Sequence, residues 1–213
     1  MSSVVFFIGI LFGLVFNKVA FKIIEQKKED SGSRRSKFLC LFSGLMTGLL
    51  YLCVYLKFGV DLQFLIGLLL ASLSVIIAHT DIFVLIIPNK VLVVFLPIFI
   101  GLRLLYNPEG WWNYPLGAFT GAGFVLLIIF LTRGGMGMGD AKLLFVYGWA
   151  IGLDHTIIAL IVASILSSIV SILLLLLKIL KKKQLIPFGP FLGIGTLVAF
   201  FFGTELISAY WHY

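Results

Sequence analysis

Long apolar runs dominate this sequence and leave few folds open to it. A helix that crosses a bilayer needs about 20 mainly apolar residues. We therefore expect an all-α, polytopic membrane protein of about eight transmembrane helices. The predicted helices are residues 3–24, 38–56, 62–80, 90–105, 115–132, 141–153, 155–178 and 186–208. The composition agrees, since 61% of the residues are hydrophobic and 12% are charged, against about 45–50% and about 25% in soluble domains.

One transmembrane domain, residues 1–213, is expected, with a short cytoplasmic linker at residues 25–37. Within residues 143–177 the only charged side chain is that of Asp154. A single span of this length would need a steep tilt. We therefore predict a helical hairpin with its tip at Asp154.

The basic residues predict the orientation of the chain. Successive connections between the predicted helices lie on opposite sides of the membrane. Fourteen of the sixteen lysines and arginines lie in or near the connections of one side, and only Lys57 and Arg103 lie on the other. The positive-inside rule places the basic set in the cytoplasm and both termini on the extracytoplasmic side. Because orientation explains the net charge of +7, we expect the lipid bilayer as a partner and no nucleic acid.

Two of the nine acidic residues are not explained by this topology. Asp81 directly follows the third predicted helix, in the nearly apolar stretch AHTDIFVLIIPN, and Asp140 stands at the entrance to the sixth, in RGGMGMGDAKLL. Ionisable residues at membrane depth are costly and often functional, so two on one face suggest a pair. The alternative is that each merely caps a helix end at the interface, as Asp140 would at a helix N-terminus.

Glycines crowd around Asp140, with Gly137 and Gly139 nearest before it. Such a Gly-x-Gly-Asp turn can expose a carboxylate and leave room for a substrate backbone. The spacing of a phosphate-binding loop is absent. We expect Lys142 to be a snorkelling interfacial residue rather than a nucleotide ligand.

Prolines interrupt the predicted helical structure at two further points. Pro88 stops a helix that would otherwise run on from Asp81, and Asn89 follows it. The segment from Pro187 through Gly189 to Pro190 begins the last predicted helix, where proline also has an ordinary structural use. No metal-ligand cluster is visible in the sequence, so no metal is expected.

These motifs, in this order and spacing, resemble the type IV prepilin peptidases, which are intramembrane aspartyl proteases of the Gly-x-Gly-Asp class. The resemblance implies that Asp81 and Asp140 form the catalytic pair. The supporting motif positions that match are Pro88, Asn89, Gly137, Gly139, Lys142, Pro187, Gly189 and Pro190. The first predicted helix adds a weaker match at Gly13, Asn17 and Lys22.

The resemblance implies an activity and its setting. Such enzymes act in the bacterial cytoplasmic membrane and remove the basic leader of prepilins or pseudopilins at the cytoplasmic face, typically after a glycine. They serve pilus, competence and secretion systems. Proteolysis is expected to need no cofactor, whereas methylation of the new N-terminus, which many members perform, would need S-adenosylmethionine.

Two departures from the family pattern bear on methylation. The large first cytoplasmic loop with two Cys-x-x-Cys pairs is replaced by the linker at residues 25–37, and Leu14 stands where a serine usually follows Gly13. We therefore expect proteolysis and leave methyl transfer open.

A membrane transporter or channel that uses Asp81 and Asp140 as ion sites is the alternative from another class. Transporter sites tend to lie near the bilayer midplane between repeats, whereas these aspartates lie toward one face and no repeat is evident. A structural scaffold would leave the glycine-rich aspartate turn unexplained. That the two side chains meet in space rests, at this point, on the resemblance.

Overall fold

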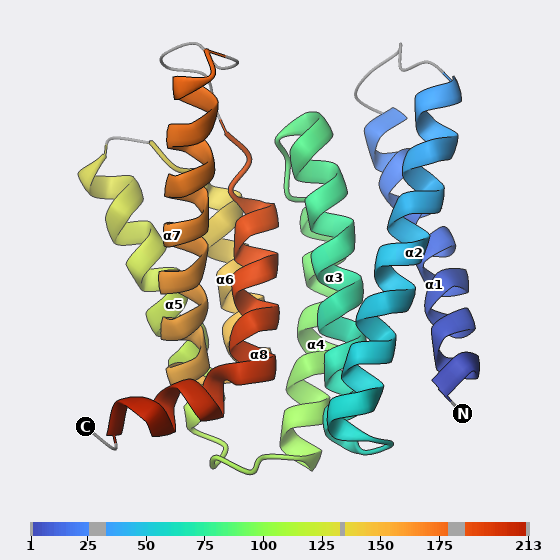
Figure 1. The fold of residues 1–213 in the computed structure, drawn as a ribbon. Coiled ribbons are helices and arrows are strands. Elements are labelled where there is room, and N and C mark those ends of the chain that lie inside the picture. Colours follow the sequence, from blue (N-terminus) through green and yellow to red (C-terminus); the bar gives the residue numbers. More distant parts are fainter. Residues whose placement is uncertain (1, 26–32, 133–134, 179–185, 212–213) are drawn as a thin grey trace.

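The computed structural model describes residues 2–25, 33–132, 135–178 and 186–211, and these form a bundle of eight helices (Figure 1). The all-helical prediction is confirmed. In chain order the helices are α1 (Ser2–Glu25), α2 (Ser33–Phe58), α3 (Leu62–Val84), α4 (Asn89–Leu105), α5 (Asn113–Leu131), α6 (Met138–Ile151), α7 (Leu153–Leu176) and α8 (Gly189–Trp211).

Most predicted boundaries differ from the observed ones by a few residues, and four of the differences bear on the linker, the site or the turns. The linker predicted at residues 25–37 is shorter, because α2 already begins at Ser33. Helix α3 continues past residue 80, so Asp81 lies in its last turn, and a left-handed Leu85 ends it. Helix α8 begins at Gly189 rather than at 186, because a proline disfavours helix in the residue before it and suits the first turn. The hairpin between α6 and α7 turns at Gly152, whose φ of 84° favours glycine, and not at Asp154.

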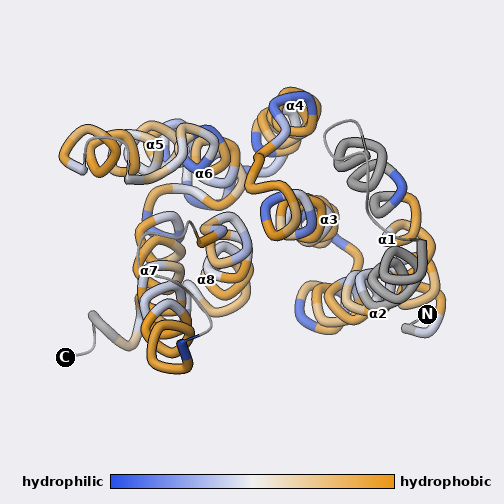
Figure 2. Tube along the Cα trace, turned by 90° about the horizontal axis from the view of Figure 1, so that it is seen from above, coloured by the Kyte–Doolittle hydropathy of each residue, from blue (hydrophilic) through white to orange (hydrophobic). Residues whose placement is uncertain are grey.

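Helix α3 is central in the bundle. Seen from above, it lies between the α1–α2 pair and the remaining helices (Figure 2), and it contacts α1, α2, α4, α6 and α8. Its buried residues Ile66, Leu70, Leu73 and Ile77 belong to the apolar core. The site described below is carried by this helix and by two of its neighbours, α6 and α8.

The α1–α2 pair packs through glycines. A Cβ at Gly9 would lie 2.8 Å from Gly48 Cα, and one at Gly13 would lie 2.9 Å from Gly44 Cα. Helix pairs in membranes use small residues in this way to bring their backbones close. Packing therefore accounts for the glycine at position 13; the side chains of Asn17 and Lys22 lie outside the described residues.

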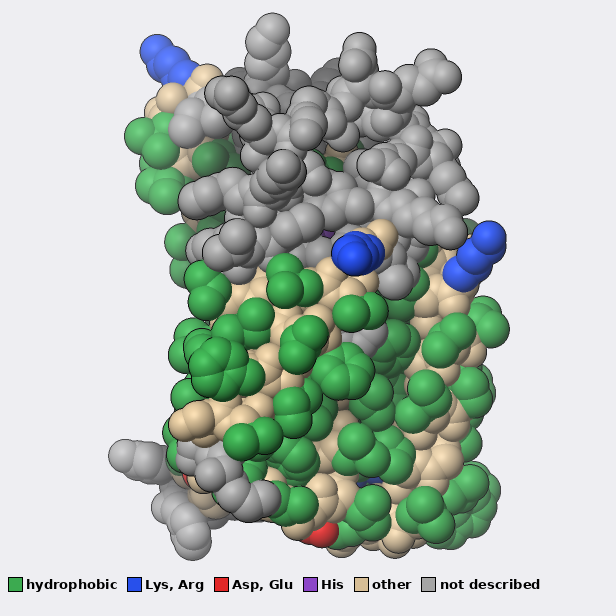
Figure 3. Space-filling model, turned by 90° about the vertical axis from the view of Figure 1, so that its right-hand side faces the viewer, with side chains coloured by type: hydrophobic (Ala, Val, Ile, Leu, Met, Phe, Trp, Pro, Cys, Tyr) green, Lys and Arg blue, Asp and Glu red, His purple; other side chains and the backbone are tan. Residues whose placement is uncertain are grey.

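The outer surface suits a bilayer. Within the described parts of the chain, four segments are long and apolar enough to cross one: Leu62–Val84, Asn113–Leu131, Leu153–Leu176 and Gly189–Ala209. Apolar side chains cover most of the described part of the face seen in Figure 3, and the prominent basic side chains stand toward its upper part. Both chain ends lie at the opposite end of the bundle (Figure 1). That all eight helices cross the membrane, and that the termini face outward, stays a prediction.

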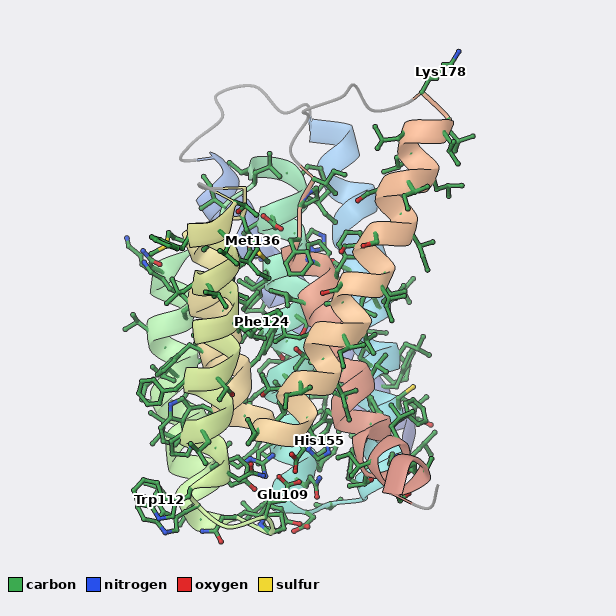
Figure 4. All side chains as sticks on the ribbon, turned by 90° about the vertical axis from the view of Figure 1, so that its left-hand side faces the viewer. Glu109, Trp112, Phe124, Met136, His155 and Lys178 are labelled. Atoms are coloured by element: carbon green, nitrogen blue, oxygen red, sulfur yellow. The ribbon has the colours of Figure 1, made fainter. Side chains whose placement is uncertain are left out.

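A polar cluster ties the helices together at the end away from the site. The Arg103 guanidinium is buried and donates to the Ala150 carbonyl from Nε (2.8 Å) and Nη2 (2.5 Å). Its Cζ lies 4.4 Å from the centre of the Tyr114 ring. Glu109 Oε1 lies 3.4 Å from His155 Nδ1, and Figure 4 shows both residues at this end. The cluster fixes the α4–α5 connection against the α6–α7 turn.

Candidate active site

Asp81 is held at the end of α3 by a backbone group of another helix. Its side chain is buried, at 6% exposure, and its Oδ2 accepts a hydrogen bond from the Gly189 N–H at 2.7 Å. Gly189 is the first residue of α8, and the amides at a helix N-terminus favour a negative group. The motif around Pro187 thus serves to present this amide to Asp81, a role that the sequence did not predict.

Asp140 lies in the first turn of α6, which Gly137 precedes. Its backbone N–H donates to the Gly137 carbonyl at 3.1 Å, and the residue is 7% exposed. At Gly139 a Cβ would lie only 3.1 Å from the Cβ of Ile87. Glycine here lets the α3–α4 connection pack directly on the turn that carries the carboxylate.

The two aspartates line one cavity of about 280 Å³. The structure therefore brings together two side chains that are far apart in the sequence. The lining also includes three apolar residues of the α3–α4 connection and four of the eight supporting-motif residues. It consists of Asp81, Leu85, Ile86, Ile87, Asn89, Gly137, Gly139, Asp140 and Lys142.

The other predicted residues surround this cavity. Lys142 is exposed and its Nζ donates to Asn89 Oδ1 at 3.3 Å. Pro88 is buried and precedes the first turn of α4. Pro187 lies before α8 and Pro190 within its first turn, so both set the start of the helix rather than line the aspartate cavity.

A second cavity, of about 490 Å³, reaches Asp140 from between α5 and α7. One wall is a row of serines on α7, at residues 164, 167, 168 and 171. Phe124 and Met136, which also line it, are labelled in Figure 4. Polar groups inside a membrane domain commonly line water-accessible space. This row was not predicted from the sequence, although serines at helical spacing in an otherwise apolar segment were visible there.

The functional groups of the site are two carboxyl groups, without a cluster of metal ligands among the described residues. Across the described ranges, no group of three or more His, Cys, Asp or Glu side chains is placed to hold a metal ion. Two carboxyl groups at one site ionise in separate steps, so that at intermediate pH one holds a proton and the other does not. Such a pair can act as a general acid and a general base together.

The fold and the site define a helical membrane protein with a paired-carboxylate centre. A family model described as the type IV leader peptidase family matches residues 68–172, a segment that contains both aspartates. A prepilin leader peptidase/N-methyltransferase of Bacillus subtilis is 31% identical over 188 residues, 88% of this chain and 76% of that protein. One of Xanthomonas campestris is 34% identical over 76 residues, 36% of this chain and 26% of that protein.

The chain belongs to the type IV prepilin peptidase family, and it is a protease. The resemblance drawn from the motifs is thereby confirmed. No solved structure matches the chain.

Proposed function

We propose that the protein is an intramembrane aspartyl endopeptidase that removes the leader of type IV prepilin-like proteins at the cytoplasmic face of the bacterial cytoplasmic membrane. The observation that carries the proposal is the common cavity of Asp81 and Asp140, at one end of the bundle, in a chain of this family. The relatives' names give the substrate class. The basic connections of the chain support a cytoplasmic position for this end, by the positive-inside rule.

The proposed chemistry uses the two aspartates as a unit. The ionised carboxylate takes a proton from water, and the oxygen of that water attacks the carbonyl carbon of the scissile peptide. The protonated carboxyl group donates its proton to the developing oxyanion or to the leaving amine. Gly189 fixes the Asp81 carboxylate through its N–H. The roles of acid and base belong to the pair rather than to one residue, since coupled groups titrate together.

Proteolysis by this route needs no cofactor. Methyl transfer, which the relatives' names include, is not part of the proposal, and S-adenosylmethionine enters only if that activity is present. An ion-transport role for the two aspartates is the competing function. A proton-coupled uptake assay with the protein in vesicles would reveal it.

Mass spectrometry of a Bacillus subtilis prepilin incubated with the purified protein tests the proposal. We expect loss of the leader with the wild-type protein, and an added methyl mass would report the second activity. Asp81→Asn and Asp140→Asn should each slow cleavage by about 10²–10⁴-fold, the range typical of general acid–base groups.

Asp154→Asn is the matched control. It makes the same substitution at an exposed acidic residue in the first turn of α7, away from the cavity, and it should cleave normally. Full cleavage by either Asp81→Asn or Asp140→Asn would rule out the catalytic pair.

A further inference from the structure

An apolar groove runs along the outer side of α6, beside the aspartate cavity. Helix α6 contacts both α4 and α5, and Figure 2 shows it between them. The groove measures about 540 Å³, within the range of about 300–1,000 Å³ typical of ligand sites. Its lining comes from all three helices: Asn89, Leu92, Val93, Leu96, Ala122, Leu126, Met138, Ala141, Lys142, Phe145 and Val146.

The shape of the groove suits another helix. Small side chains, those of Ala122 and Ala141, lie among larger ones in the lining, and Ala141 is buried. Val93 and Leu126 remain exposed at 69% and 43%. Small residues let a second helix approach closely, and larger flanking side chains supply contact area.

The groove adjoins the aspartate cavity. Asn89 and Lys142 line both spaces, and the hydrogen bond between them forms a polar rim where the two meet. Met138 and Ala141 line the groove on the same helical turn that carries Asp140. A helix seated in the groove would therefore end beside the carboxylates, where its chain can leave the helix and enter the cavity.

We propose that the substrate carries an apolar helical segment next to its scissile bond and that this groove docks that segment. The inference rests on the proposed function and names how that site captures its substrate. The charge of the protein argues against capture of the substrate through its basic leader, because the net charge is +7 and most basic residues are predicted at the catalytic end. Capture then depends on apolar contact within the membrane. A lipid chain or a second copy of the protein are the competing occupants.

Site-specific photocrosslinking tests the proposal with a matched pair on α5. Benzoylphenylalanine is placed at Leu126, which lines the groove, or at Leu127, which is 53% exposed and is not part of the groove lining. The probe substrate is the same Bacillus subtilis prepilin. The peptidase that carries the photoprobe also carries Asp140→Asn, so that the substrate is not cleaved and the complex persists. We expect at least several-fold more prepilin adduct from position 126, mapped by mass spectrometry to the apolar segment of the prepilin.

Equal adducts at the two positions, or adducts from position 126 only to lipid or to a second copy, would overturn the docking proposal. Each probe protein is first assayed for leader cleavage with Asp140 intact. Absence of cleavage by the wild-type protein overturns the proposed function, whereas cleavage without groove adducts overturns only the docking.

A kinetic pair gives an independent readout. Ala122→Trp fills the groove, while Gly123→Trp adds the same side chain where no atom lies within 4 Å of a Cβ. We expect Ala122→Trp to raise KM for the prepilin by at least about tenfold, which corresponds to about 1.4 kcal/mol of binding. Gly123→Trp should leave KM unchanged. An unchanged KM for Ala122→Trp in a folded protein would also overturn the proposal.

Discussion

Replacing Gly189 by alanine tests whether the start of α8 positions the Asp81 carboxylate. The added Cβ would lie 2.8 Å from Asp81 Oδ2 and 3.0 Å from Ile77 Cγ2, whereas nonbonded carbon contacts are optimal at about 3.5–4.0 Å. Either the carboxylate turns away or α8 moves back. In both cases the hydrogen bond of 2.7 Å from the Gly189 N–H to Asp81 is lengthened or lost.

The size of the effect follows from the bond that is disturbed. A hydrogen bond to a charged group contributes about 1.5–3 kcal/mol. Because each 1.36 kcal/mol of barrier is tenfold in rate, kcat for leader cleavage should fall by about 10-fold to about 150-fold. KM should change little, since no residue of α8, Gly189 included, lines the proposed docking groove.

Gly123→Ala is the control, because a Cβ there meets no atom within 4 Å. Prepilin cleavage is followed by gel shift or mass spectrometry at several substrate concentrations, and thermal unfolding in detergent reports folding. A wild-type kcat for Gly189→Ala would refute the positioning role. The same loss in both glycine variants would do so too.

Three further outcomes are expected. Cleavage should follow a bell-shaped pH profile, falling at low pH where both carboxyl groups are protonated and at high pH where both are ionised; a profile with one limb would contradict the pair. Tyr147→Phe, which removes the 3.0 Å hydrogen bond to Ser74, should lower the free energy of unfolding by about 0.6 kcal/mol, with unchanged kcat. Arg103→Met, which removes the two hydrogen bonds to the Ala150 carbonyl, should lower it by about 1.5–3 kcal/mol. A large loss of kcat in either stability variant would show that the two ends of the bundle are coupled.

The helices, and the two aspartates as candidate site residues, were predicted from the amino-acid sequence alone. Apolar runs must become helices when they are surrounded by lipid, because every backbone polar group needs a partner within the segment. Each of the eight predicted runs therefore corresponds to an observed helix. Asp81 and Asp140 were identified because a charge at membrane depth has few structural explanations.

How these residues meet depends on the packing of the helices, which the sequence did not show. The sequence predicted that Asp81 follows a helix, yet α3 includes it. Its hydrogen-bond partner is the backbone N–H of Gly189, 108 positions further along the chain. A backbone amide has no sequence signature, and a shared cavity depends on how α3, α6 and α8 pack. The groove beside α6 arises in the same way, because periodicity shows that a helix is apolar but not which of its apolar faces remains without a neighbour.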